Sequence, residues 1–336
     1  MRSWSDAVKF SVRLNNDRPV SEYIALAQAA EQVGFDQFWV SNDLFLRSAP
    51  VILAAVAQST SRIEIGTCIL NPYTINPAEI AMMAATLDEL SAGRFNLGLA
   101  SGADDFLGWL GITASKPRTA VIETVHTINR LLSGERAEAN GPFLQWSSET
   151  YLRFPVKRRV PIYLGAMSPN MLRAIGEVAD GGLPLLFPPE HYQKAVSYIR
   201  EGAAEAGRRL EDIDVAACIW CSISDSYDGA ADTLKEKIAY YGHAMSPTIL
   251  ANLGLGREDF ADIEHAVMTE NNMEKAKSLV TEAMVRIGIA GTTHDLIERL
   301  EGLVAVGVRH ISLGPPLGPN PVAAIEAVGR DVLPYF

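Results

Sequence analysis

Strand-like segments alternate with helix-like segments along most of the 336-residue chain, and this alternation limits the possible folds more than any other feature. Short apolar runs indicate buried strands, whereas apolar residues that recur every three to four positions indicate helices packed on them. Strands that alternate with helices form parallel sheets. The predicted strands are 9–14, 37–41, 63–70, 95–100, 161–166, 182–187, 215–224 and 310–313, and the predicted helices are 21–33, 50–58, 77–90, 118–132, 169–178, 190–206 and 321–332.

Eight strands of this kind favour a closed barrel over an open sheet, and no G-x-G-x-x-G follows the first strand to indicate a dinucleotide fold. We predict an α/β fold, a (β/α)8 TIM barrel. The surplus length forms insertions after strands 4 and 7, at Ser133–Arg159 and at about 230–289, and we expect the second to cover the barrel mouth. Without a repeat or a Gly/Ser linker, residues 1–336 are predicted to form a single domain.

Charge and composition exclude several classes of protein. A net charge of −11 argues against nucleic acid as a partner, because phosphate binding needs a concentrated basic face. No apolar run of about 18 residues could cross a membrane, and the start MRSWSDAVKF lacks the apolar core of a signal peptide. Cys68, Cys218 and Cys221 are odd in number and lie in apolar runs, so we predict a cytoplasmic protein and interpret the C-x-x-C at 218–221 as structural.

Polar and small residues follow several predicted strands, where a barrel places its catalytic groups. The segment 63–102 contains two apolar strands with such exits, the first at Asn71 and the second at Ser101 and Gly102. Small residues at the second exit allow a ligand to approach the backbone. The sequence therefore predicts a cofactor site at the mouth of the barrel.

Four segments make the chain resemble the luciferase-like superfamily. They read IGTCILNPYTINPAEIAMMAATLDELSAGRFNLGLASG, PIYLGAMSPNMLRAIGEVADG, IREGAAEAGRRLEDIDVAACIWCSI and GPPLGPNP. Within that superfamily the chain is similar to the coenzyme F420-dependent branch, especially the methylenetetrahydromethanopterin reductases. The resemblance covers nearly the whole chain and implies a bacterial-luciferase-like barrel. It also implies a homodimer formed through the helices around the second and third strands.

The resemblance implies a site for coenzyme F420, with FMN as the alternative. It implies a non-prolyl cis peptide in a bulge at Cys68–Ile69, whose backbone supports the middle ring of the cofactor; the other interpretation of Cys68 is a buried core thiol. Asn71, Ser101 and Gly102 complete the expected cofactor contacts on this side.

A second part of the cofactor site is implied at the turn Gly165, Ala166, Met167 and Ser168, which corresponds to the family's phosphate-holding turn. Backbone N–H groups and the helix dipole favour an anion where such a turn enters a helix. Ser168 as an ordinary N-cap, with Pro169 at the first helical position, is the alternative, and both can hold at once.

Three further residues are candidates for catalysis. Asn42 and Asp43 stand where many deazaflavin enzymes of the superfamily carry an Asp-His pair. Asp43 would act as a general acid or base if burial raises its pKa, and Asn42 would bond the edge of the ring. Ordinary turn chemistry is the alternative for both. Arg13 suits a carboxylate or phosphate, and an internal ion pair with Asp43 is its alternative.

Two departures from the reductases bear on the activity. The resemblance implies a glutamate in the first strand and an aspartate after the fourth, and this chain has Arg13 and Ala103 there. We therefore predict an oxidoreductase that passes a hydride between F420 and a small organic substrate, with altered active-site acids. An FMN-dependent monooxygenase and a cofactor-binding barrel without catalysis are the alternatives. No histidine shows the spacing of a metal site.

Overall fold

The computed structural model describes residues 8–245 and 247–336, so most of the N-terminal stretch examined for a leader lies outside the described residues. Eight parallel strands close into a barrel in the order β1, β2, β3, β4, β7, β8, β9 and β11, with β11 paired to β1, as predicted. The strands are β1 (Lys9–Leu14), β2 (Gln37–Val40), β3 (Glu64–Thr67), β4 (Phe95–Leu99), β7 (Ile162–Ala166), β8 (Gly181–Pro184), β9 (Asp214–Ile223) and β11 (His310–Leu317).

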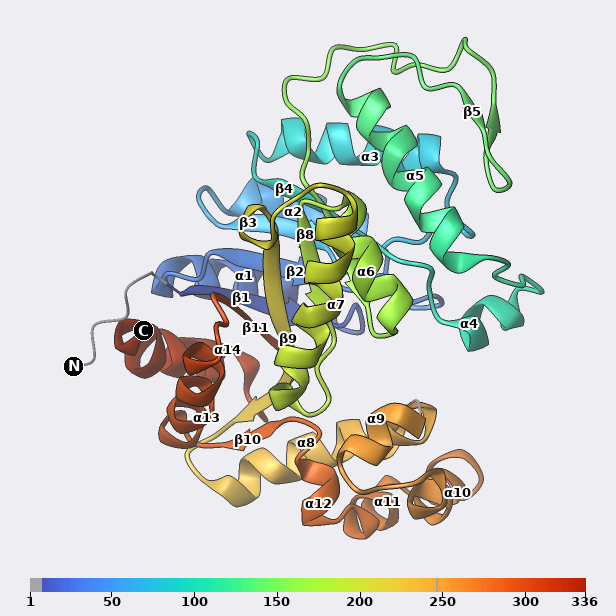
Figure 1. Cartoon of the computed structure of the whole chain (residues 1–336). Helices are drawn as coiled ribbons and strands as arrows, with labels where there is room; N and C mark the ends of the chain where they lie inside the picture. Colours follow the sequence, from blue (N-terminus) through green and yellow to red (C-terminus); the bar gives the residue numbers. More distant parts are fainter. Residues whose placement is uncertain (1–7, 246) are drawn as a thin grey trace.

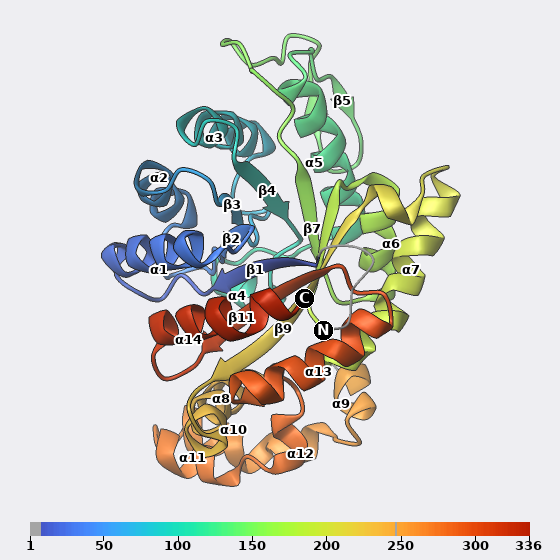
Figure 2. The ribbon, with the colours of Figure 1, turned by 90° about the vertical axis from the view of Figure 1, so that its left-hand side faces the viewer.

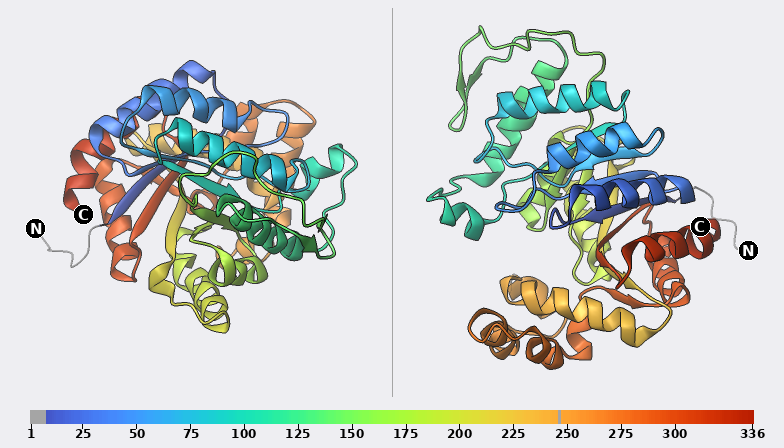
Figure 3. Two further views of the ribbon diagram at one scale, coloured as in Figure 1. Left: turned by 90° about the horizontal axis from the view of Figure 1, so that it is seen from above. Right: turned by 180° about the vertical axis from the view of Figure 1, so that it is seen from behind.

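Helices surround the barrel and cover the outward apolar face of its strands (Figures 2 and 3). They are α1 (Val20–Val33), α2 (Ala49–Ser59), α3 (Pro77–Leu90), α5 (Pro117–Leu132), α6 (Pro169–Val178), α7 (Tyr192–Glu205), α13 (Thr293–Ala305) and α14 (Pro321–Ala327). Local sequence sets several starts: Asn76 accepts a hydrogen bond from Ala78 N at 2.9 Å at the start of α3. Helix α13 was not predicted, although Thr292 and Asp295 form a capping box at its start.

The surplus length forms two excursions. The first contains α4 (Asp104–Trp109) and a small hairpin, β5 (Ala139–Asn140) with β6 (Gln145–Trp146). The second ends at β10 (Ile289–Gly291) and contains the helices α8 (Tyr227–Tyr241), α9 (Pro247–Asn252), α10 (Ala261–Met268), α11 (Met273–Leu279) and α12 (Glu282–Val285). These helices share an apolar cluster with Phe187 and Trp220 of the barrel. In Figure 1, α4, α9 and α10 lie on the opposite side of the molecule from the C-terminus.

Polar side chains close the amino end of the barrel. Glu64 accepts a hydrogen bond from Gln37 Nε2 at 2.8 Å, and Asp214 accepts one from the Tyr163 hydroxyl at 2.9 Å. His310 Nδ1 lies 2.9 Å from the other carboxylate oxygen of Asp214. Because these groups satisfy one another and an apolar layer lies next to them, the barrel is filled at this end.

Candidate active site at the carboxyl end of the barrel

The peptide bond between Cys68 and Ile69 is cis, which confirms the expected backbone geometry at the end of β3. The regular ladder of β3 stops at Thr67, and pairing with β4 returns as an isolated bridge between Leu70 and Leu99. The predicted strand 63–70 is therefore interrupted by a bulge at its carboxyl end. We call residues 67–70 the β3 bulge.

The β3 bulge is held by Thr67 and Gly98. Thr67 Oγ1 accepts a hydrogen bond from Gly98 N at 3.0 Å and donates one to Gly98 O at 3.1 Å. Gly98 O also accepts from Leu70 N at 2.8 Å. A Cβ on residue 98 would lie 1.9 Å from Thr67 O, so only glycine permits this approach.

Asn71 and Gly102 lie side by side beyond the β3 bulge. Asn71 Oδ1 accepts hydrogen bonds from Tyr73 N at 3.1 Å and Thr74 N at 3.0 Å, so it shapes the loop that leads to α3. A Cβ on Gly102 would lie 3.2 Å from Asn71 Cγ. Ser101, immediately before it, is partly exposed. The structure brings the two strand exits together as predicted, and their role in cofactor binding stays a prediction.

The turn at 165–168 joins the same region. A Cβ on Gly165 would lie 3.0 Å from Ile69 Cγ2, so this turn packs directly against the β3 bulge. Ser168 Oγ accepts a weak hydrogen bond from Met171 N at 3.4 Å and Pro169 begins α6, so the N-cap interpretation is confirmed. Ala166 is buried and Met167 is exposed. No contact in the structure tests the phosphate role.

Arg13 points into the barrel near the carboxyl ends of its strands and is only 5% exposed. Its Nε and Nη2 atoms are buried and have no hydrogen-bond partner. The guanidinium lies close enough to the thiols of Cys68 and Cys218 to interact with them. A Cβ on Gly314 would lie 2.3 Å from Arg13 Nη2, so the glycine of β11 leaves the room that the guanidinium occupies.

Asn42 and Asp43 differ in what they do at the mouth. Asn42 Oδ1 accepts a hydrogen bond from Ala49 N at 3.0 Å at the start of α2, which is the turn chemistry given as its alternative. Asp43 is half-buried, and its backbone N–H donates to Asn16 Oδ1 at 3.1 Å. Burial raises the pKa of the Asp43 carboxyl; Lys237 and Arg13 oppose that rise and Asp17 adds to it.

Asp43 and Arg13 do not form the direct ion pair considered as an alternative: among the ion pairs of residues 8–245 and 247–336, none joins them. They influence each other through space only. Asp43 and Arg13 thus share the mouth of the barrel, and Arg13 keeps unsatisfied donors there.

Lys237 of α8 is a member of this site that the sequence analysis missed. Its Nζ lies 4.1 Å from the ring centroid of Tyr241 and 5.3 Å from that of Trp220, both cation–π distances. Burial lowers the pKa of Lys237 to about 8, with Asp43 opposing the fall and Arg13 adding to it. A signal was present: Lys237 lies one helical turn from the buried Leu234 and from Tyr241, on the apolar stripe of the helix.

Aromatic side chains lie in the loops near this end. Trp109 of α4 packs on Phe45 at a centroid distance of 5.5 Å and on Phe106 at 5.1 Å. Phe45 and Trp109 both remain largely exposed. They give α4 and the loop after β2 a shared apolar surface.

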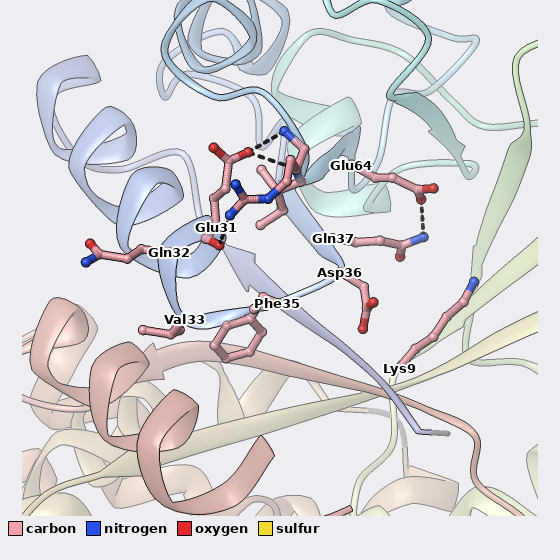
Figure 4. Close-up of a pocket in the computed structure, with 11 residues that line it drawn as sticks. Lys9, Glu31, Gln32, Val33, Phe35, Asp36, Gln37 and Glu64 are labelled. Atoms are coloured by element: carbon pink, nitrogen blue, oxygen red, sulfur yellow. Dashed lines mark hydrogen bonds between the residues drawn. The ribbon is translucent and has the colours of Figure 1, made fainter. Parts of the chain in front are cut away.

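A surface pocket of about 470 Å³ lies away from this site, outside the filled amino end of the barrel, between the end of α1 and the starts of β1, β2 and β3 (Figure 4). Its carboxylates already have partners: Glu31 accepts from the backbone of Ser61 at 2.9 Å, and Asp36 accepts from Phe10 N at 2.8 Å. Glu64 is bonded to Gln37, as the dashed line in Figure 4 marks. In TIM barrels residues at this end serve stability, so we place the candidate site at the other end.

The three cysteines are free thiols, and burial raises the pKa of each, to about 12 for Cys68 and Cys221. Cys218 faces the barrel interior, whereas Cys221 belongs to the core cluster on the outside of the strand. The structural interpretation of the C-x-x-C therefore holds. Within the described residues, no cluster of His, Cys, Asp or Glu could hold a metal ion, and no helix is long and apolar enough to span a membrane.

Comparison with known proteins places the chain in a family. The family model described as luciferase-like monooxygenase matches residues 2–310. A 5,10-methylenetetrahydromethanopterin reductase of Methanolobus tindarius is 32% identical over 96% of this chain and 99% of its own length. An F420-dependent glucose-6-phosphate dehydrogenase of Microbacterium testaceum is 26% identical over 94% of this chain and 93% of its own length.

Solved structures agree with the sequence matches. The coenzyme F420-dependent tetrahydromethanopterin reductase of Methanopyrus kandleri superposes with a TM-score of 0.93 at 31% identity, covering 98% of this chain and 99% of the reductase. Together, the match over 2–310, the whole-length identity and the barrel show that the chain belongs to the luciferase-like monooxygenase family.

Proposed function

We propose that this protein is an oxidoreductase that passes a hydride between coenzyme F420 and a small organic substrate. The observation that carries this function is the whole-length match to F420-dependent reductases in both sequence and structure. The shape of the barrel mouth supports it, because the β3 bulge, the exit of β4 and the turn at 165–168 meet at one place.

The residues present fit a tricyclic cofactor with an anionic tail. The backbone of Cys68 and Ile69 would support the ring, with Asn71, Ser101 and Gly102 beside it. Gly165 keeps the space next to Ile69 free of a side chain, and the backbone of Ala166, Met167 and Ser168 would receive the phosphate at the start of α6. When bound there, F420 supplies two-electron hydride chemistry at its ring.

Asp43 would accept, or in the reverse direction donate, the proton that accompanies the hydride. Removal of a hydride from a carbon that carries a hydroxyl group leaves a carbonyl group and releases the hydroxyl proton. Asp43 is a half-buried carboxyl at the mouth with a raised pKa, so it is suited to accept that proton and, in the reverse direction, to return it. Asn42 would fix the loop that carries Asp43, because its side chain anchors the start of α2.

Arg13 and Ala103 indicate a substrate other than methylenetetrahydromethanopterin. An acid that activates a pterin cannot be replaced in its role by a guanidinium or a methyl group. We therefore propose a reductase-like barrel with a different small-molecule substrate.

The second candidate is an FMN-dependent monooxygenase, which the description of the matched family model favours. Titration of the purified protein with F420 and with FMN, followed by cofactor fluorescence, separates the two. We expect binding of F420 at micromolar concentration and at least tenfold weaker binding of FMN. Tighter binding of FMN, with oxygen consumption when reduced FMN is supplied, would instead support the monooxygenase.

We further propose a cytoplasmic homodimer of single-domain subunits that binds no nucleic acid. A dimer surface is supported by exposed apolar side chains on neighbouring helices: Val51 on α2 is 63% exposed and Met82 on α3 is 45% exposed. The acidic net charge of −11 argues against nucleic acid. The apolar cluster that Phe187 and Trp220 share with the insertion supports treating 1–336 as one domain.

A further inference from the structure

Two cationic side chains from distant parts of the chain come near each other at the barrel mouth: the Arg13 guanidinium lies beside Gly314, Gly314 pairs with Trp220, and the Trp220 ring faces Lys237. Arg13 comes from β1, and Lys237 comes from α8 of the insertion that packs over Trp220. Both cations act on the Asp43 carboxyl and oppose the rise of its pKa. We call Arg13 and Lys237 the cationic pair.

Arg13 carries a buried charge without a matching partner. Burying a charged group is costly unless hydrogen bonds or an opposite charge compensate it. Its Nε and Nη2 atoms have no hydrogen-bond acceptor in good geometry among the described residues. The nearby thiols of Cys68 and Cys218 interact with the guanidinium but are weak acceptors, and they stay neutral because burial raises their pKa. A guanidinium with two such donor atoms is suited to a carboxylate or phosphate group.

Lys237 adds a second positive group to the same space. Tyr241 and Trp220 hold its ammonium by their ring faces, and no hydrogen bond or ion pair within the described residues involves its Nζ. Two carboxyl groups act on Lys237 through space, those of Asp43 and of the exposed Asp17. Among the described residues, neither carboxyl forms an ion pair with Arg13 or Lys237, so both cations remain available to an anion.

The cationic pair and the expected cofactor site occupy different parts of the barrel rim. The cofactor residues belong to β3, β4 and β7, whereas the pair belongs to β1 and to a helix packed over β9. Strand β2 separates β1 from β3 in the barrel order. A ligand held by the pair would lie beside the β3 bulge, next to Cys68, where a substrate must lie to exchange a hydride with a ring on that bulge.

We propose that Arg13 and Lys237 together bind an anionic group, a carboxylate or a phosphate, on the substrate, so that this enzyme acts on small anionic molecules. This rests on the proposed function, because the site of the hydride is set by the cofactor. The anionic parts of the cofactor itself are the other source of the same chemistry, and the experiment separates the two.

The test is calorimetric titration of the F420-loaded protein with inorganic phosphate and with benzoate as probes. We expect at least one of the two probes to bind the wild-type protein. Arg13→Met and Lys237→Met should each weaken that binding at least tenfold. Lys235→Met is the matched control, because Lys235 lies on the same helix but pairs with Glu282 at 3.3 Å. It should leave probe binding unchanged.

Two further readouts make the test specific. Binding of benzoate, which does not itself titrate near pH 8, should take up about half a proton at that pH in the wild type, because a nearby anion raises the pKa of Lys237 from about 8, and this uptake should vanish in Lys237→Met. The affinity for F420, measured by its fluorescence, should change less than threefold in Arg13→Met, and a cooperative denaturant unfolding transition shows separately that the variant is folded.

The outcomes are distinct. Failure of the wild type to bind F420 overturns the proposed function. F420 binding without probe binding, or probe binding equal in all variants, overturns the anion site alone. A loss of F420 affinity of tenfold or more in folded Arg13→Met assigns the arginine to the cofactor and also overturns the substrate assignment.

Discussion

The carbonyl oxygen of Thr67 lies in the space that a side chain on Gly98 would occupy, 1.9 Å from the ideal Cβ position. This contact joins the ends of β3 and β4 and places the β3 bulge beside the exit at Ser101 and Gly102. The geometry of the proposed cofactor site thus depends on one glycine that touches no cofactor.

We expect Gly98→Ala to force Thr67 away from β4 and to destabilise the protein by about 1–3 kcal/mol, as overpacking of a filled site does. It should also weaken F420 binding at least tenfold, because the bulge moves. Denaturant unfolding and F420 fluorescence measure the two effects. Gly302→Ala is the control: no atom lies near its Cβ position, and it should be neutral or slightly stabilising. Equal F420 affinity in Gly98→Ala and wild type would contradict this account of the bulge.

Thr67→Val tests the hydrogen bonds of the same contact without adding bulk. It removes the bonds of Oγ1 to Gly98 N and O and should cost about 1–3 kcal/mol of unfolding free energy, because both groups are buried. Thr67→Ser keeps the hydroxyl and should retain most of the stability and the F420 affinity. If the serine and valine variants behaved alike, the hydroxyl would have no part in holding the bulge.

Asp43→Asn should separate catalysis from stability. The variant loses the proton acceptor, so we expect kcat/KM to fall by roughly 10²-fold with F420 affinity unchanged. Because burial raises the folded-state pKa of Asp43, its ionisation costs stability as pH rises above the ordinary carboxyl range; the asparagine removes that cost. Asp43→Asn should therefore be at least as stable as the wild type at pH 7. Undiminished turnover would exclude Asp43 as the proton acceptor.

The pH dependence of anion binding should follow Lys237. Its pKa is lowered to about 8, so its charge is present below that value and is lost as pH rises through it. We expect the affinity for benzoate, which keeps one negative charge throughout, to fall between pH 7 and pH 9 in the wild type and in Lys235→Met. In Lys237→Met the affinity should be low and nearly flat over the same range. The same fall with pH in Lys237→Met would assign the titration to another group.

The proposed dimer surface is tested by the double variant Val51→Lys and Met82→Lys. Two charges placed on exposed apolar positions of α2 and α3 would be desolvated in an interface and should convert a dimer to monomers. Light scattering after gel filtration measures the mass. Val306→Lys, at an exposed position in the turn after α13, is the control and should leave the mass unchanged. A dimer in the double variant would place the interface elsewhere.

Local signals explain which elements the sequence predicts well. Helices Pro77–Leu90 and Pro169–Val178 have the predicted bounds because a capping side chain and a proline define each start. The strand predicted at 310–313 extends to Leu317. Pro315 and Pro316 end the apolar pattern in the sequence, but they do not end the strand. The apolar pattern of the predicted strand also continues from Thr67 to Leu70, because such a pattern does not distinguish a bulge from a regular strand. Only the family resemblance predicted the bulge.

The candidate site likewise has one part that the sequence predicts and one part that it does not. Its cofactor side lies at consecutive strand exits, which the barrel rule locates from sequence alone. Lys237 belongs to an insertion helix whose placement depends on packing against Phe187 and Trp220, and no local pattern connects it to Arg13 or Asp43. Whether Arg13 and Asp43 form an ion pair likewise depends on tertiary geometry, which no local sequence pattern encodes.

Whether this protein uses F420 is decided by titration of the purified wild-type protein with oxidised F420. We predict saturable quenching or shift of F420 fluorescence with a micromolar Kd, at least tenfold tighter than the Kd for FMN, and binding at least tenfold weaker in Gly98→Ala. No spectral change with F420 at concentrations up to the millimolar range, in a protein that is folded, would contradict it.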